Sequence, residues 1–348
     1  MVIVRLLVRG AIALVATVGL ASCQTWDQLF APTEPWLTPD ELVVIVNQAD
    51  PLSVQIGEYY QQQRKLPLRN IIRVNFAPGR TELSPGEFQE LKQTIESQIP
   101  SYIQAYALTW AAPYRVGCMS ITSAFALGFD PAYCAEGCKF TKPNPYFNRD
   151  TSQPFQELQM RPTIAIAATT FDQAKALIDR GLAADATFPT GTAYLLSTSD
   201  QQRNVRAGLY PQVMQALKPR FHIEQVQADQ LTNRRDVMFY FTGLAQVDDL
   251  ERNQFLPGAI ADHLTSFGGM LTDSPQMSSL RWLEAGATGS YGTVVEPCNF
   301  PQKFPHPAIV MARYLNGETL IEAYWKSVAM PGQGILIGEP LARPFGSF

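Results

Sequence analysis

The chain has 348 residues, of which 46% are apolar and 17% charged, and its formal net charge is −4. These values are typical of a folded globular protein and exclude a largely disordered chain. Because the chain contains no long run of Lys and Arg, the composition also argues against a nucleic-acid partner.

The first residues carry the features of a bacterial lipoprotein signal. Arg5 and Arg9 give a positive start, and the apolar run 11–20 is too short to span the hydrocarbon core of a bilayer. An apolar residue, two small residues and Cys23 then follow, in the pattern at which a signal peptidase cleaves and the thiol is lipidated. We therefore predict a cleaved signal over 1–22 and an exported protein held to the membrane through lipidated Cys23.

Residues 23–40 contain three prolines and no periodic apolar pattern, which predicts a tether between the membrane and the folded domain. Gln24 follows the cysteine in place of the aspartate associated with retention in the inner membrane. The sequence therefore favours the periplasmic side of the outer membrane. The alternative at this end of the chain is a short membrane anchor with an unmodified cysteine.

From residue 41 onward, strand-like and helix-like patterns alternate. Apolar runs predict strands at 42–46, 71–76, 106–110, 163–167, 193–196, 222–226, 237–241, 270–272, 291–295 and 335–337. Caps and amphipathic spacing predict helices after Asp50, after Ser84, and near 170–182, 204–217, 257–266, 277–285, 307–315 and 319–328. Such alternation predicts an α/β fold with parallel sheets and helices on both faces, arranged as two subdomains over 41–188 and 189–348.

A long segment interrupts this alternation. Residues 113–160 are rich in Gly, Pro, Cys and aromatic residues, and we predict an irregular insert at the end of a strand. In an oxidising envelope, the four cysteines beyond Cys23 predict two disulfides, with three possible pairings. Those candidates are Cys118, Cys134, Cys138 and Cys298. The short spacing between Cys134 and Cys138 favours a local bridge there.

The chain offers little for cofactor chemistry. Its three histidines are far apart and none lies near the clustered cysteines, so we predict no metal site. It contains no Gly-rich phosphate-binding motif and no GxSxG elbow, so we predict neither a nucleotide cofactor nor an α/β-hydrolase site.

Three segments resemble the gingipain-like and caspase-like cysteine peptidases. They are VMFYFTGLAQVDD at 237–249, GGMLTDSPQMSSLRWLEAGATGSYGTVVEP at 268–297 and ILIGEPLARPF at 335–345. In those peptidases one strand ends in a Gly-His-Gly turn, and the next core strand ends at the nucleophilic cysteine. The resemblance implies a caspase-like domain at 189–348, preceded by a subdomain like the one before the peptidase domain of gingipains.

A second resemblance covers nearly the whole chain beyond the signal. The segments WAAPYRVGCMSITSAFALGFD, LRWLEAGATGSYGTVVEPCNFPQKFPHP and GILIGEPLARPF are similar to those of a bacterial family found in genomes with the exosortase (PEP-CTERM) sorting system. This resemblance implies a cell-envelope setting, linked to protein sorting or exopolysaccharide export, and supplies no activity.

The peptidase pattern is broken at its two chemical positions. The Gly-His-Gly turn reads Gly243-Leu244-Ala245, and the strand expected to end in cysteine ends in Thr272-Asp273-Ser274. Because leucine cannot take a proton from a thiol, the resemblance implies a degenerate site without a Cys-His dyad. We therefore predict a pseudo-peptidase that binds a peptide, a protein or a glycan, or that takes part in assembly.

Two alternatives remain open. One is an envelope cysteine hydrolase with a relocated site made of Cys298, His306 and an acid, either Glu296 or Asp273. In the competing interpretation Cys298 is in a disulfide and His306 only caps a helix. The other alternative is a structural scaffold of a secretion complex.

Candidate ligand-binding residues lie where predicted parallel strands end. Ligand sites occupy the carboxyl ends of such strands, so three residues that follow strands are binding candidates. Two residues at the start of the insert are candidates as well. These candidates are Gln246, Asp248, Ser274, Tyr114 and Arg115. We predict structural roles for His222, at the start of a strand, and for His263, in a helix.

Overall fold

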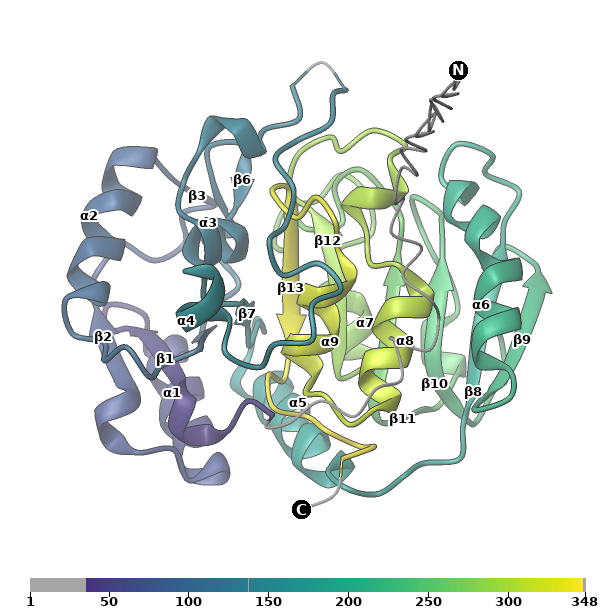
Figure 1. The fold of residues 1–348 in the computed structure, drawn as a ribbon, viewed down its shortest axis with the longest axis horizontal. Coiled ribbons are helices and arrows are strands. Elements are labelled where there is room, and N and C mark those ends of the chain that lie inside the picture. The colour runs from purple at the N-terminus through teal and green to yellow at the C-terminus, as the bar shows by residue number, and fades with distance from the viewer. Residues whose placement is uncertain (1–35, 137, 347–348) are drawn as a thin grey trace, which may run out of the picture.

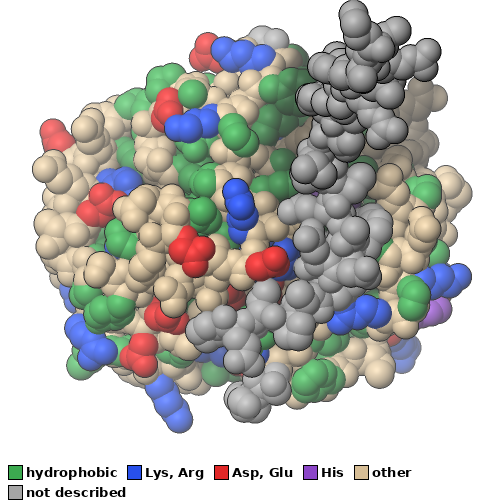
Figure 2. All heavy atoms as spheres, viewed as in Figure 1, with side chains coloured by type: hydrophobic (Ala, Val, Ile, Leu, Met, Phe, Trp, Pro, Cys, Tyr) green, Lys and Arg blue, Asp and Glu red, His purple; other side chains and the backbone are tan. Residues whose placement is uncertain are grey.

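A computed structural model describes residues 36–136 and 138–346, and the predicted signal, Cys23 and most of the tether lie outside these described residues. The described part folds into a ten-stranded sheet and a separate three-stranded sheet (Figure 1). No helix in this part is long and apolar enough to cross a bilayer. On the face drawn in Figure 2, acidic and basic side chains are interspersed over the described residues.

The first half of the chain contributes one end of the large sheet. Its strands are β1 (Leu42–Asn47), β2 (Ile71–Val74), β4 (Ala105–Leu108) and β7 (Thr163–Ala165), paired in parallel in the order β2-β1-β4-β7. Its main helices are α1 (Pro51–Arg64), α2 (Pro85–Glu96) and α5 (Phe171–Ala184). The predicted caps are confirmed: Asp50 accepts a hydrogen bond from Leu52 N at 3.0 Å, and Ser84 forms a capping box with Glu87.

The second half completes the sheet. Its strands β8 (Thr192–Ser197), β9 (His222–Gln227), β10 (Val237–Thr242), β11 (Phe255–His263) and β12 (Gly289–Thr293) pair in parallel in the order β12-β11-β10-β8-β9. Its helices are α6 (Tyr210–Leu217), α7 (Leu280–Glu284), α8 (Pro307–Leu315) and α9 (Leu320–Ser327). Every residue of β8 and β10 is buried, and because alternate residues face opposite ways, both faces of the sheet are covered. The predicted α/β class is confirmed.

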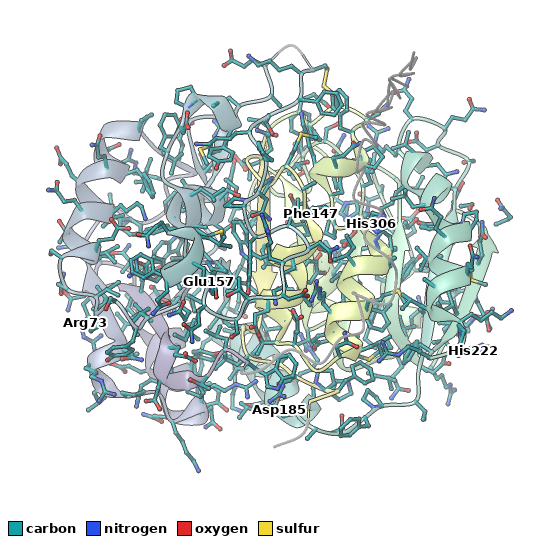
Figure 3. All side chains as sticks on the ribbon, in the orientation of Figure 1. Arg73, Phe147, Glu157, Asp185, His222 and His306 are labelled. Carbon is teal, nitrogen blue, oxygen red and sulfur yellow. A yellow bond between two sulfur atoms is a disulfide. The ribbon has the colours of Figure 1, made fainter. Side chains whose placement is uncertain are left out.

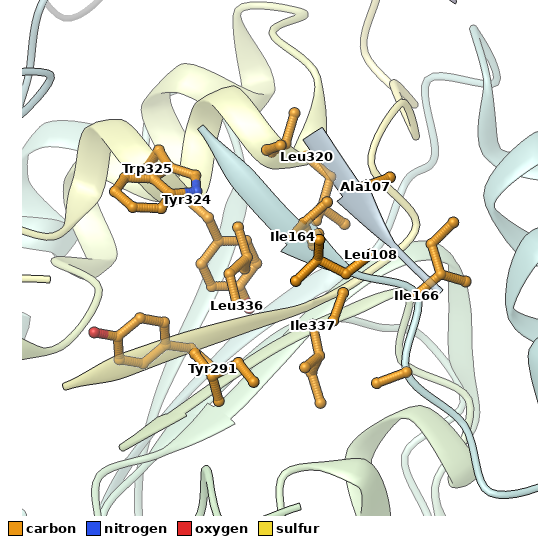
Figure 4. Close-up of a cluster of buried hydrophobic side chains, with 14 of the residues drawn as sticks. Ala107, Leu108, Ile164, Ile166, Tyr291, Leu320, Tyr324, Trp325, Leu336 and Ile337 are labelled. Carbon is orange, nitrogen blue, oxygen red and sulfur yellow. The ribbon is translucent and has the colours of Figure 1, made fainter. Parts of the chain in front are cut away.

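The last strand joins the two halves. β13 (Gly334–Gly338) is antiparallel to β12 and lies next to β7, so the strands of the two predicted subdomains form one sheet. Figure 4 shows buried side chains at this junction, and those it labels come from β4, β7 and the residue after it, β12, β13 and α9. Burial of such aliphatic and aromatic side chains stabilises the junction by about 1.5–3 kcal/mol for each one.

Two secondary-structure predictions are wrong at the same place. The segment 257–266, predicted as a helix, belongs largely to strand β11, and 270–272, predicted as a strand, is a turn. β11 carries apolar residues on both faces, and Leu256, Ala259, Ile260 and Leu264 happen to follow helical spacing. Periodicity alone cannot separate a fully buried strand from a helix. His263 therefore ends a strand and does not lie in a helix.

The insert is more ordered than predicted. It contains α3 (Ile121–Leu127) and α4 (Pro154–Leu158), and its strands β5 (Arg115–Val116) and β6 (Met119–Ser120) form a small sheet with β3 (Glu82–Leu83). The Ser120 side chain accepts a hydrogen bond from Ser123 N at 3.0 Å and so caps α3.

The prediction of two disulfides is confirmed, but the predicted local bridge between Cys134 and Cys138 is wrong. The bonds join Cys118 to Cys134 and Cys138 to Cys298. The second bond links the insert to the loop after β12, across 160 residues of sequence. Spacing in the sequence could not reveal this pairing, because the two partners meet only when β12 and the insert reach the same edge of the sheet.

A buried ion network holds the end of β13 against the first half of the chain. The Arg64 guanidinium donates to Glu339 Oε1 at 2.9 Å and Oε2 at 2.6 Å, and also to Asp185. The Tyr60 hydroxyl donates to Glu339 Oε1 at 2.7 Å. The Glu339 carboxylate is fully buried and depends on these partners for its charge.

Removing the cation of this network should destabilise the fold strongly. In Arg64→Met, the Glu339 carboxylate stays buried without its counter-ion, and we expect the free energy of unfolding to fall by about 3–5 kcal/mol. Urea unfolding followed by circular dichroism measures the change.

The matched control is Arg69→Met. Arg69 pairs with Asp40 at 3.7 Å, and both side chains are exposed to solvent, at 66% and 73%. Because such a surface pair contributes little to stability, the Arg69→Met variant should unfold at the same urea concentration as the parent chain. Equal free energies of unfolding for Arg64→Met and Arg69→Met would contradict a stabilising role for the buried network.

Candidate functional site

A pocket of about 300 Å³ lies at the carboxyl ends of the second-half strands. Its walls come from the loop after β8, the loop after β11, the loop after β12 and the tip of the insert. The lining residues are Gln202, Arg203, Leu264, Thr265, Ser266, Glu296, Pro297, Cys298, Asn299 and Cys138. This edge is where parallel sheets carry their ligand sites, and we call the cavity the edge pocket.

Arg203 is the cation of the edge pocket. Its guanidinium donates through Nε to Thr265 Oγ1 at 3.1 Å and through a terminal nitrogen to Asp200 Oδ2 at 2.7 Å. The Arg203 side chain is 26% exposed and lines the edge pocket. A guanidinium oriented in this way is preorganised to receive a carboxylate or another oxyanion.

Side-chain hydrogen bonds hold the loop after β11 in place. Gln276 Oε1 accepts from Thr265 Oγ1 at 2.7 Å and from Phe267 N at 2.9 Å. Thr293 Oγ1 lies 2.9 Å from the carbonyl oxygens of Thr265 and Ser266. These bonds fix the wall of the pocket from behind and leave its open side to a ligand.

The loop after β12 and the insert tip form the rim. Glu296 Oε1 accepts from Cys298 N at 2.7 Å, and Cys298 is bonded to Cys138 of the insert. The rings of Phe140 and Phe300 lie 4.7 Å apart between the same two segments. Lys303 Nζ donates to Lys139 O at 3.0 Å, and burial lowers the pKa of this ammonium group to about 8.

The residues of the predicted alternative hydrolase site are not assembled. Cys298 and Glu296 share the edge pocket, but the Cys298 sulfur is in a disulfide and has no thiolate to act as nucleophile. His306 is the N-cap residue of α8 and is not among the described residues that line the pocket. The Asp273 carboxylate accepts a hydrogen bond from the Tyr114 hydroxyl at 2.6 Å.

The other predicted binding residues are not among the described residues that line the pocket. Tyr114 brings the insert onto the turn after β11, and its burial and the bond to Asp273 raise its pKa to about 12. Arg115 pairs with Glu82 at 2.8 Å within the small sheet. Ser274 Oγ donates to Phe267 O at 2.7 Å and so shapes that turn. The remaining two, Gln246 and Asp248, are exposed in the loop after β10.

His263 cannot serve as a base. The ring is fully buried, Trp282 Nε1 donates to its Nδ1 at 2.8 Å, and its Nε2 lies 3.1 Å from Met277 O. Because an indole nitrogen only donates, Nδ1 is the unprotonated nitrogen and Nε2 carries the hydrogen. Burial lowers the pKa of His263 to about 3, so the imidazole stays neutral with both nitrogens engaged.

The remaining histidines are also unsuited to this site. Burial lowers the pKa of His306 to about 4, and its Nδ1 has no hydrogen-bond partner among the described residues. His222 is exposed at the start of the edge strand β9, at the outer side of the molecule and away from His306 (Figure 3). Within 36–136 and 138–346, no group of three or more His, Cys, Asp or Glu side chains is placed to hold a metal ion.

The strand end at which the sequence resemblance places the peptidase nucleophile also needs correction. β11, which follows β10 in the chain and pairs with it, ends at His263 and is followed by Leu264–Ser266, so the core strand after β10 does not end at Thr272–Ser274. Sequence reasoning missed Gln202 and Arg203, and it missed Leu264–Ser266 because β11 resembles a helix. The available signal was position, since each of these residues follows the carboxyl end of a parallel strand.

The buried histidines should make stability depend on pH. The pKa values of His263 and His306 in the folded state lie below the usual 6.5. Below about pH 6.5 these imidazoles are therefore protonated in the unfolded chain but stay neutral in the folded chain, and the free energy of unfolding falls as the pH drops. In His306→Gln, the loss of unfolding free energy between about pH 6 and pH 4.5 should be shallower by on the order of 1 kcal/mol per pH unit. Urea unfolding across this range tests it, and a slope equal to that of the parent chain would contradict it.

Comparisons with known proteins give matches at the level of structure. No protein-family model matches the chain, and no curated protein sequence matches it. The fold is similar to that of the Arg-specific cysteine proteinase gingipain R, with 11% identity and a TM-score of 0.46 over 90% of this chain and 80% of that one. It is also similar to the Porphyromonas gingivalis RgpB pro- and mature-domain complex, with 9% identity and a TM-score of 0.44 over 87% and 79% of the two chains. At these identities the similarity concerns the fold alone.

Proposed function

We propose that this chain is a non-catalytic binding protein of the bacterial cell envelope, a pseudo-peptidase whose edge pocket holds a peptide, protein or glycan ligand. One observation carries the proposal. The pocket occupies the ligand-binding edge of a parallel sheet, it contains an oriented guanidinium, and the two cysteines that line it are bonded to each other, so neither supplies a thiolate.

The groups around the pocket support binding without catalysis. A cysteine nucleophile needs a neighbouring imidazole to take its proton. Leu244 occupies the turn after β10, Leu264 follows β11, and the nearby His263 is buried with both nitrogens engaged. None of the pocket-lining residues in the described part is a histidine.

The envelope setting rests on the sequence. The positive start, the apolar run and the small residues before Cys23 are the basis for an exported lipoprotein, and Gln24 after the cysteine favours the periplasmic side of the outer membrane. Disulfides persist in oxidising compartments and are rare in the cytosol of mesophiles, so the two bonds are in keeping with this location. The similarity to exosortase-associated proteins suggests a role linked to protein sorting or exopolysaccharide export.

The ligand should contain a carboxylate or a similar oxyanion. Arg203 is the pocket's cation, and the neighbouring Gln202 and Asn299 side chains can hydrogen-bond to the polar groups of a peptide or sugar. The carboxyl terminus of a peptide and the carboxylate of an acidic sugar both meet this requirement.

Binding of carboxylates tests the role of Arg203. We expect sodium acetate and short peptides with a free carboxyl terminus to shift the NMR signals of 264–266 and 296–299. Arg203→Ala should weaken this binding by about tenfold or more, because a hydrogen bond to a charged group contributes about 1.5–3 kcal/mol.

Arg281→Ala is the matched control, since Arg281 also pairs with a carboxylate three residues away, Glu284 at 2.8 Å, but on α7. It should bind like the parent chain. Equal weakening in both variants would refute the assignment of Arg203.

The same preparation tests the absence of catalysis. We expect no peptide hydrolysis, and no alkylation of Cys298 by iodoacetamide in the unreduced folded protein, because its sulfur is bonded to Cys138. Hydrolysis that disappears in Cys298→Ala would overturn the proposal in favour of the cysteine hydrolase.

A further inference from the structure

The two disulfides differ in their surroundings. Cys134 is buried, with 8% of its surface exposed, and its partner Cys118 is half-buried beside the small sheet. Cys138 is exposed at the tip of the insert, and both Cys138 and Cys298 line the edge pocket. A soluble thiol can therefore reach the second disulfide more easily than the first, and access is one of the factors that set the rate of thiol–disulfide exchange.

The backbone at the second disulfide is also unusual. Cys138 and Cys298 have φ angles of +56° and +59°, in the left-handed region that residues with a Cβ atom rarely adopt. Neither Cys118 nor Cys134 has a positive φ. The Cys138–Cys298 bond is thus built between two disfavoured backbone conformations at the mouth of a pocket, the kind of place where such conformations often serve function.

Few other contacts hold the two loops together. Cys138 N bonds to Ala135 O at 3.0 Å, and Phe300 N bonds to Cys298 O at 2.9 Å, so each loop turns on itself. Between them the described contacts are the Phe140–Phe300 ring pair and the bond from Lys303 Nζ to Lys139 O. By contrast, the segment that carries Cys134 is held to the residue before β13 by a hydrogen bond independent of its disulfide, from Gln333 Nε2 to Tyr133 O.

We propose that the Cys138–Cys298 disulfide is a redox-modification site that a dithiol reduces in the folded protein, releasing the insert tip from the rim of the edge pocket. This inference rests on the proposed binding function of that pocket and adds a control to it. The Cys118–Cys134 bond remains oxidised and keeps the rest of the insert in place.

The exchange needs a dithiol reductant and transfers two electrons. One thiolate of the reductant bonds to the exposed Cys138 sulfur, and Cys298 leaves as a thiolate that takes up a proton. The second thiolate of the reductant then attacks the reductant sulfur that is bonded to Cys138. The bond between that sulfur and Cys138 breaks, and Cys138 leaves as a thiolate that takes up a proton. The products are two cysteine thiols on the protein and a disulfide on the reductant.

Selective reduction is the first test. The folded protein is treated with limiting dithiothreitol, alkylated with N-ethylmaleimide at intervals and digested for mass spectrometry. We expect Cys138 and Cys298 to be alkylated about tenfold faster or more than Cys118 and Cys134, because exchange follows access. Equal rates for the two pairs would overturn the inference.

Hydrogen exchange of the rim is the second test. Reduction should speed amide exchange in 138–140 and 296–300, and the double variant Cys138→Ser/Cys298→Ser should show this faster exchange without reductant and no further response to it. The control Cys118→Ser/Cys134→Ser should keep the reductant response of the rim. An unchanged rim after reduction of Cys138–Cys298 would refute the release.

Neither readout needs a bound ligand. Selective reduction with release of the rim, but without carboxylate binding at Arg203, would overturn the proposed function and leave the redox site standing. Carboxylate binding at Arg203, together with equal reduction rates for the two disulfides, would overturn the redox site and leave the proposed binding function standing.

Discussion

The strand nearest the end of the chain, β13, occupies the centre of the large sheet, between β12 and β7. Without it, the strands of the first and second halves would have no shared hydrogen bonds and no shared core at this junction. The Arg64–Glu339 network locks its far end, where a buried carboxylate can exist only beside a cation. Both halves of the fold therefore depend on one buried strand and on the charge pair that follows it.

This arrangement also makes the edge pocket possible. The loops that follow parallel strands lie at one edge of the sheet, and the loops after β8, β11 and β12 line the pocket there. The insert, which belongs to the first half, reaches the same edge and is bonded there through Cys138. The start of β13 lies beside the insert as well, since Ser120 N donates to Gly332 O at 2.9 Å. The site is thus a product of the junction and belongs to neither half alone.

Several titratable side chains of the described residues are kept neutral or are ion-paired. His263 and His306 are kept neutral by burial, and Arg64 and Glu339 neutralise each other in the core. Arg203 is also ion-paired, with Asp200 at 2.7 Å, but its side chain is 26% exposed and lines the edge pocket. A fixed guanidinium is suited to recognition where the described pocket lining has no imidazole and no thiolate, and a covalent bond at the rim is suited to controlling access.

The sequence by itself determined the α/β class, the capped helices, most strand positions and the presence of two disulfides, because these follow from local periodicity, side-chain capping and cysteine number. It misassigned β11, whose burial on both faces removes the alternation that marks a strand. Only the tertiary structure decided the Cys138–Cys298 pairing, the place of Arg203 beside Thr265 and the position of His306 outside the described lining of the edge pocket. These features depend on which strand ends meet at one edge of the sheet, and residues far apart in sequence carry no local signal of that meeting.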